Sequence, residues 1–176
     1  GPTIADDIKS GAVYSIIFSL IVVFLYILIR FRKWQFSLGA VVALLHDVLF
    51  VMGVFSLADG FLPFQLEVDQ AFIAAILTVI GYSLNDTVVV FDRIRENMGS
   101  RGKQNGVSIN KSLNQTLSRT FNTSLTTFFV LLVIFLFGGE VIRGFMFALL
   151  LGVLVGTYSS LFIATPVMFD ASDKES

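Results

Sequence analysis

Cysteine is absent from the 176 residues, and histidine occurs only once. These absences exclude thiol catalysis, disulfides, zinc clusters and metal sites with several histidine ligands, so we expect neither a metal nor a cofactor. Charge is also scarce, because Asp, Glu, Lys and Arg make up 14% of the chain, against about 25% in soluble domains. This shortage of polar groups excludes an ordinary soluble enzyme and a disordered segment.

Apolar residues take the place of the missing charge. They make up 55% of the chain and include 19 Phe, and the mean hydropathy is +0.83. The composition therefore predicts a membrane-embedded protein. The formal net charge of -1 gives no indication of nucleic-acid binding.

Five stretches are long and apolar enough to cross a bilayer core of about 30 Å, which needs roughly 20 helical residues. Backbone groups in lipid must satisfy their own hydrogen bonds, and the alternating pattern of a membrane barrel is absent. We therefore predict an all-α polytopic membrane protein, a single transmembrane domain over 1–176 with a five-helix bundle. The expected spans are about 11–29, 38–58, 70–91, 122–137 and 145–166.

The basic residues predict the orientation of this bundle. Only Lys9 and Arg143 fall on the side of the bundle where the chain begins. Since basic loops stay in the cytoplasm, we expect the N-terminal end outside and the C-terminal end inside. The cytoplasmic side would hold ten basic residues: Arg30, Arg32, Lys33, Arg93, Arg95, Arg101, Lys103, Lys111, Arg119 and Lys174.

The segment before the fourth span is too polar to cross a membrane. Its apolar residues Val107, Ile109, Leu113, Leu117 and Phe121 recur at helical spacing among polar ones. This pattern predicts a cytoplasmic amphipathic helix over about 107–121 that lies along the membrane interface. The simpler interpretation is a solvated connector.

The first residues, Gly1 and Pro2, follow no initiator methionine. A Gly-Pro pair is compatible with a protease scar from a tag or with native sequence inside a longer protein. An N-terminus outside the membrane without a signal peptide leads us to expect at least one earlier membrane span upstream.

Ionisable residues inside a span are costly, at about 2.5 to 3.5 kcal/mol each, and so indicate function. Asp86 follows Asn85 in the third span at a depth of roughly 10 Å, and His46 and Asp47 lie roughly 12 Å deep in the second, by helical rise. Arg119 stands just before the fourth span. We interpret these five residues as candidates for a proton relay or ion path. The alternative is a buried polar cluster whose only role is to hold the helices together. For Arg119, the alternative is a side chain that extends to the membrane interface without a further role.

Small residues recur at every fourth position of the fifth span. Such a ridge lets another helix backbone approach closely. The sequence does not tell whether the neighbour belongs to this bundle or to a partner. The ridge consists of Gly144, Ala148, Gly152, Gly156, Ser160 and Ala164.

The motif GYSLNDTVVVFDRIRE over 81–96 closely resembles the SecF members of the SecD/SecF protein-export family, in the resistance–nodulation–division superfamily. Further matches are Gly1-Pro2, Arg30-Phe31, His46-Asp47 and the run NKSLNQTLSRT over 110–120. The resemblance extends to about Phe169. Members of the family carry an additional span and an outward-facing soluble domain before the Gly-Pro. The resemblance therefore implies that this chain is the C-terminal membrane portion, either of a separate SecF protein or of a SecD–SecF fusion.

The resemblance implies a bacterial inner-membrane subunit that uses the proton-motive force to assist export of secreted proteins. The implied partners are SecD, the Sec translocation channel with its motor ATPase, the exported polypeptide and the lipid bilayer. The family's proton-linked aspartate and arginine fall on Asp86 and Arg119. No enzymatic activity is expected.

Two other functions share parts of this pattern. An intramembrane aspartyl protease needs two membrane carboxylates, which Asp47 and Asp86 would supply, but the GxGD signature of that class is absent. A proton-coupled exporter of small molecules from the same superfamily shares the proton chemistry but normally has a longer chain with two sets of spans.

Overall fold

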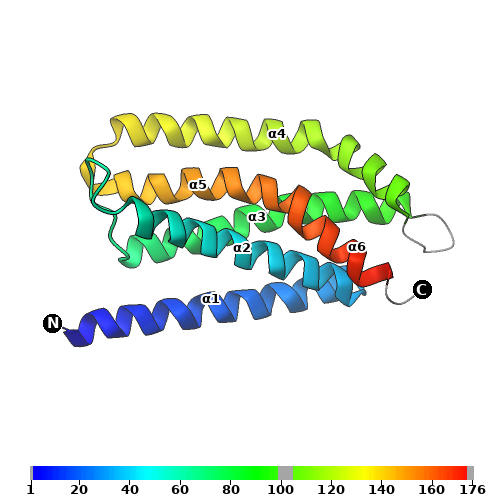
Figure 1. Cartoon of the computed structure of the whole chain (residues 1–176), viewed down its shortest axis with the longest axis horizontal. Helices are drawn as coiled ribbons and strands as arrows, with labels where there is room; N and C mark the ends of the chain where they lie inside the picture. The colour runs from blue at the N-terminus through cyan, green and yellow to red at the C-terminus, as the bar shows by residue number, and fades with distance from the viewer. Residues whose placement is uncertain (1, 99–104, 174–176) are drawn as a thin grey trace.

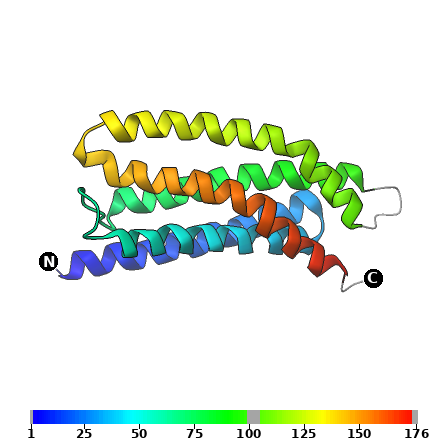
Figure 2. The same ribbon diagram turned by 45° about the horizontal axis from the view of Figure 1, so that its top comes forward.

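The computed structural model describes residues 2–98 and 105–173 as a bundle of long helices, and no strand occurs in these two ranges. Figure 1 shows α1 and α4 on opposite sides of the bundle, and Figure 2 shows the same arrangement after a turn of 45°. The helices are α1 (Pro2–Phe31), α2 (Trp34–Ala58), α3 (Gln70–Asn97), α4 (Gly106–Phe137), α5 (Arg143–Ser159) and α6 (Thr165–Asp173).

Five helical segments have the length and hydropathy of membrane spans. The fifth runs through α5, a π-helical stretch at Ser160–Ala164, and α6. The predicted all-α polytopic bundle is confirmed. The helices extend beyond several predicted spans because flanking polar residues continue them, as at Asp92–Asn97 of α3.

The amphipathic segment 107–121 does not form a helix of its own. It is the first half of α4, which continues without a break to Phe137. Asn105 begins the helix by accepting a hydrogen bond from the backbone N–H of Ser108 at 2.7 Å. The hydroxyl-bearing face of the segment packs against the end of α3, where the Asn97 amide donates to Ser112 at 2.8 Å. The expected helix is thus continuous with the fourth span, and its place at the membrane interface stays a prediction.

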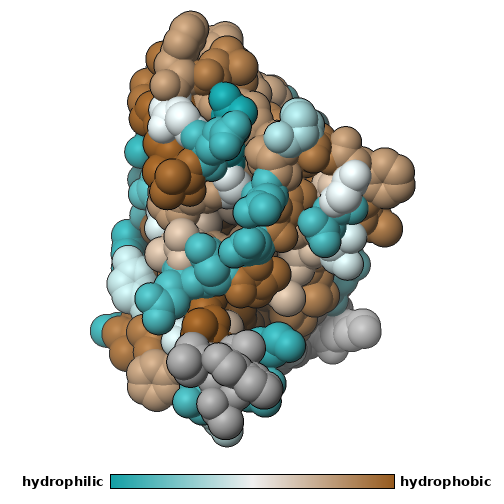
Figure 3. All heavy atoms as spheres, turned by 90° about the vertical axis from the view of Figure 1, so that its left-hand side faces the viewer, coloured by the Kyte–Doolittle hydropathy of each residue, from teal (hydrophilic) through white to brown (hydrophobic). Residues whose placement is uncertain are grey.

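The two ends of the bundle differ in charge. The acidic end is defined by Asp59, Glu67, Asp69 and Glu140 in its two connections, and its end-on view shows a hydrophilic band among apolar side chains (Figure 3). The basic end is defined by Arg30, Arg32, Lys33 and Arg95. The expected basic residues Arg101, Lys103 and Lys174 lie outside the described residues, as does Gly1.

The small residues of α5 bring this helix against α3. A Cβ atom placed on Gly152 would overlap the side chain of Val79, and one placed on Gly156 would lie 3.0 Å from the Ser83 Cβ. At the π-helical stretch, the Ala164 carbonyl lies against Gly39 of α2 so closely that a Cβ there would overlap it. Ala148 and Ser160 are buried, and Gly144 is half-buried. The ridge therefore packs within this bundle.

Helix α1 is fastened mainly at the basic end. Arg30 pairs with Asp92 of α3, with its Nη2 at 2.8 Å from Oδ1 and 3.0 Å from Oδ2. Beside this ion pair, Phe31 stacks on Phe36 with ring centroids 5.0 Å apart, and both meet the edge of Phe91. The single side of α1 that is buried lies in its second half, at Val23, Ile27 and Phe31.

The π-helical stretch lies where α5 passes the polar interior. Pro166 follows it and has no backbone N–H to continue the regular pattern, and the Thr165 hydroxyl donates to the Ser160 carbonyl five residues earlier at 3.3 Å. Widened turns of this kind are frequent at functional sites.

Replacing Gly152 with valine is expected to lower the free energy of unfolding by roughly 1–3 kcal/mol, the usual cost of overpacking. The added methyl groups would overlap Val79 and push α5 from α3. Thermal unfolding of the purified protein in detergent measures the effect. The double variant Gly152→Val/Val79→Ala should recover part of the loss, since the two residues are in contact.

Gly53→Val is the matched control, because Gly53 is exposed and a Cβ atom placed on it would have open space around it. Its effect should stay within about 0.5 kcal/mol. Equal destabilisation by Gly152→Val and Gly53→Val would contradict the close α3–α5 contact.

Candidate functional site

Asp47 of α2 is fully buried between three helices. Its Oδ2 accepts hydrogen bonds from the hydroxyls of Ser83 in α3 at 2.6 Å and Ser159 in α5 at 2.8 Å. Its Oδ1 lies 3.1 Å from the Nδ1 of His46. A buried carboxylate with three donors is well compensated for the loss of water, and it ties α2, α3 and α5 together.

His46 lies at the edge of this cluster. Its side chain is 36% exposed on the surface of the bundle. The imidazole packs near Phe50 and Tyr158, with ring centroids 6.1 Å and 6.5 Å away. The structure therefore brings His46 to Asp47 but not to Asp86.

Asp86 of α3 is also buried, with 3% of its surface exposed, but its surroundings are much poorer in donors. Its Oδ2 accepts one long hydrogen bond, from the Ser124 hydroxyl of α4 at 3.4 Å. The Thr157 hydroxyl of α5 lies 2.5 Å from that of Ser124. Asp86 thus sits where α3, α4 and α5 meet, with weak compensation for its charge.

Arg119 and Asn85 lie on the outer surface of the bundle. Both side chains are exposed, and among the described residues Asn85 makes no hydrogen bond and Arg119 makes no ion pair. In the described part of the chain, no hydrogen bond or ion pair joins Arg119 to Asp86. The predicted network of His46, Asp47, Asp86 and Arg119 at matching depth is therefore divided into a buried part and an exposed part.

A row of hydroxyls lines the buried face of α4. Each member lies four residues from the next, which places all of them on one side of the helix. The Thr120 hydroxyl is buried and has no hydrogen-bond partner within the described residues. The row consists of Ser112, Thr116, Thr120 and Ser124.

Three serines that surround the two carboxylates were not among the predicted site residues, namely Ser83, Ser124 and Ser159. The four-residue spacing of hydroxyls that includes Ser124 was a usable signal. No comparable signal marked Ser83 or Ser159, because a single serine in a span is common and its direction depends on packing.

A second hydroxyl contact joins α3 to the end of α5 next to the Asp47 cluster. Thr87 and Ser160 lie 2.8 Å apart through their hydroxyl oxygens, and Ser160 also lies within 3.2 Å of the Ser83 carbonyl. Hydroxyl groups therefore extend the polar part of the α3–α5 contact from Ser83, which bonds Asp47, to Thr87, which follows Asp86 on α3.

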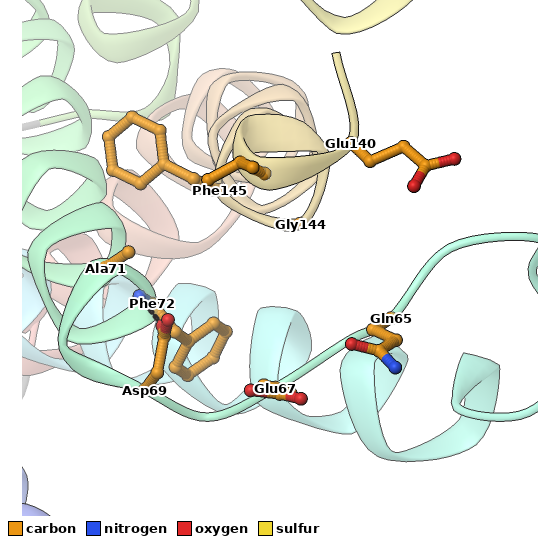
Figure 4. A pocket seen from close by; sticks show the side chains of 9 residues that line it. Gln65, Glu67, Asp69, Ala71, Phe72, Glu140, Gly144 and Phe145 are labelled. Carbon is orange, nitrogen blue, oxygen red and sulfur yellow. Dashed lines mark hydrogen bonds between the residues drawn. The ribbon is translucent and has the colours of Figure 1, made fainter.

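A hollow of about 140 Å³ at the acidic end is lined by several carboxylates, but these carboxylates do not point toward one common position. Figure 4 shows Glu140 and Glu67 pointing apart, while Asp69 accepts a hydrogen bond from the Phe72 backbone N–H at 2.8 Å. Within 2–98 and 105–173, no three His, Cys, Asp or Glu side chains are placed to hold a metal ion.

Comparison with known proteins identifies the family. The model of the family "Protein export membrane protein SecD/SecF, C-terminal" matches residues 1–174. The chain belongs to the SecD/SecF family. Its relatives include the protein translocase subunit SecF of Rhodothermus marinus, 60% identical over 171 residues, and that of Thermodesulfovibrio yellowstonii, 48% identical.

These matches cover 97% and 96% of the chain but only 55% and 54% of the two SecF relatives. The chain thus spans about half the length of the curated SecF proteins it matches. It is a SecF-type, multi-pass membrane protein.

Solved SecDF structures have the same fold. SecDF of Thermus thermophilus superposes with a TM-score of 0.84 and 40% identity, covering 100% of this chain and 23% of that one. SecDF in the super-membrane-facing form gives a TM-score of 0.79 with 41% identity, over 89% of this chain and 20% of that one.

Ser83→Ala and Ser159→Ala should each lower the free energy of unfolding by about 1–3 kcal/mol, because each removes a donor from a buried carboxylate. The double variant leaves Asp47 with His46 alone, so its loss should exceed the sum of the two. Ser56→Ala, at an exposed position of α2, is the control. Chemical unfolding that gives Ser83→Ala and Ser56→Ala the same midpoint would contradict this account of Asp47.

Proposed function

We propose that the chain is the membrane-embedded part of a Sec protein-export subunit that uses the proton-motive force to assist translocation of secreted proteins. In this proposal Asp86 gains and loses the proton. The observation that carries it is the burial of Asp86 inside a span with one hydrogen bond of 3.4 Å.

The contrast with Asp47 supports the choice of Asp86. A buried carboxylate that lacks donors is poorly stabilised in its charged form, and binding a proton removes the unfavourable charge. Asp47 has two short hydrogen bonds from serines and a histidine neighbour. We therefore assign Asp47 and His46 to holding the helices in place around Asp86.

Protonation of Asp86 would change the contact between three helices. The charged form attracts the Ser124 hydroxyl of α4, which in turn neighbours Thr157 of α5. The neutral form loses most of this attraction and any attraction to the positive charge of Arg119. Such a difference between two states is what a proton needs in order to shift an equilibrium between conformations.

The geometry gives no support to the protease alternative. An aspartyl dyad requires two carboxylates that share a proton, whereas Asp47 and Asp86 have separate hydrogen-bond partners. Export of small molecules is the weaker alternative, because the relatives that match nearly the whole chain are named translocase subunits. We expect no enzymatic activity.

We further propose that the protein resides in the bacterial inner membrane with its basic end in the cytoplasm. Positive residues near the ends of spans favour that side. The start of α1 and the acidic end would then face the periplasm.

Part of the bundle surface fits a protein partner better than lipid. Asn85, Arg119, Thr123 and Thr126 are exposed on neighbouring faces of α3 and α4, and polar groups in contact with lipid are unfavourable. We propose that SecD, as a separate subunit or fused upstream, covers this surface. The solved relatives are SecDF chains. The Sec channel with its motor ATPase and the exported polypeptide complete the proposed assembly.

Asp86→Asn in the full-length protein should abolish the part of export that depends on the proton gradient. The amide has the same shape as the carboxyl group but does not change its charge by gaining or losing a proton. Export driven by ATP should remain. Translocation of a secreted protein into inverted membrane vesicles, with and without a protonophore, measures both parts.

Glu96→Gln is the control, since Glu96 lies on the same helix but is exposed and pairs with Arg93 of that helix. It should retain the gradient-dependent part. If Asp86→Asn is present at normal levels and its export responds to the protonophore as before, Asp86 is not the proton carrier.

Asn85→Cys should form a disulfide with a cysteine placed in a membrane span of SecD, as detected on non-reducing gels. The chain has no native cysteine. Leu154→Cys, at an exposed apolar position of α5, should form no such bond. Cross-linking from Leu154 instead of Asn85 would place SecD on another surface.

A further inference from the structure

The half of α1 nearer the acidic end stands apart from the rest of the bundle. Figure 1 shows α1 and α2 diverging from their connection toward this end. A hollow of about 420 Å³ lies between α1, α2 and α3, and its lining is apolar apart from Lys9. The lining includes Ala12, Val13, Ile16, Leu49, Met52 and Ile73.

The space continues around α1. A neighbouring hollow of about 410 Å³ shares Ala12 and Ile73 with the first and adds Asp7 and Gln70. An apolar groove at this depth of a membrane offers nothing to hydrogen-bond water, and left empty its walls would lose dispersion contacts. A hydrocarbon chain is the filler that suits such walls.

Charges at the mouth of the groove determine the headgroup. Lys9 is exposed, and within the described residues it has no ion-pair partner. It stands immediately before the apolar run of α1, and a lysine at the end of such a run commonly extends to the membrane interface, where lipid phosphates lie. Two carboxylates precede it on α1, Asp6 and Asp7, and both are exposed. Asp7 lines the neighbouring hollow.

This arrangement favours a headgroup that carries both signs. A phosphate is complementary to Lys9, whereas a headgroup with net negative charge would be repelled by Asp6 and Asp7, which outnumber Lys9 at the start of α1. An ammonium next to the phosphate reverses that repulsion. We propose that the groove between α1, α2 and α3 binds an acyl chain of a phosphatidylethanolamine-type lipid, with its phosphate at Lys9 and its ammonium facing Asp7. The site is independent of the proton chemistry at Asp86.

The test uses the full-length protein with its SecD partner in vesicles of equal parts phosphatidylethanolamine and phosphatidylglycerol. A photoreactive benzoylphenylalanine replaces Met52, whose side chain lines the groove and is partly exposed. Mass spectrometry then identifies the adduct. Val133, on the apolar outer face of α4, is the reference position.

We expect the Met52 position to yield about fivefold more phosphatidylethanolamine than phosphatidylglycerol adduct, and the Val133 position nearly equal amounts. Lys9→Gln should reduce the lipid adduct at Met52 by a similar factor, and Asp7→Asn should bring the ratio toward that at Val133. Arg143→Gln, which removes the other cation of the acidic end, should change neither.

Three results would overturn the proposal. They are an excess of phosphatidylglycerol at Met52, the same lipid yield with Lys9→Gln as with Arg143→Gln, and adducts with a protein segment in place of lipid. The last would mean that another helix of the full-length protein or of SecD fills the groove.

Discussion

The approach of α5 to α3 across small side chains is the constraint on which the polar interior depends. Hydroxyl groups of serine reach only a short distance from the backbone, so a serine bonds across to another helix only where the two backbones are close. Gly152 and Gly156 provide that closeness against Val79 and Ser83. As a result Ser83 and Ser159 reach the same carboxylate oxygen of Asp47.

The two buried carboxylates differ in how many hydrogen bonds they receive from the α3–α5 contact. Asp47 is held by short hydrogen bonds from both sides of the α3–α5 contact, whereas Asp86 lies three residues beyond Ser83 on α3 and has one long hydrogen bond from Ser124 of α4. A bundle that fixes one carboxylate and leaves the other with few donors concentrates its sensitivity to protons at one place. That division fits the proposed role of Asp86 in export.

The sequence predicted the spans and the ridge because both depend on local periodicity. Leu, Phe and Val runs reveal a helix in lipid without reference to any neighbour, and six small residues four positions apart share one face in any helix. The estimated depth of Asp47 and Asp86 uses the same helical rise and stays a prediction. The course of residues 107–121 could not be predicted in this way, because the contact of Ser112 with Asn97 that keeps this segment in α4 joins two helices.

The relation between Asp86 and Arg119 was beyond sequence reasoning for the same physical cause. Equal depth places two side chains at one level of the membrane but leaves their rotation about each helix open. Arg119 lies about 100° around α4 from Thr120, and this rotation turns it to the surface while Thr120 is buried. Which way a helix faces is decided by packing with its neighbours.

The ion pair between Arg30 and Asp92 has a mechanical consequence for α1. A helix of 30 residues is roughly 45 Å long, and this one is held at the basic end by an ion pair and stacked phenylalanines while its other half has little contact with the bundle. Any tilt of α1 would therefore turn about its contacts at the basic end. A tilt of about 5° about these contacts displaces the other end of the helix by about 4 Å. A small rearrangement beside Asp92 would thus produce a larger displacement of α1 at the acidic end of the bundle.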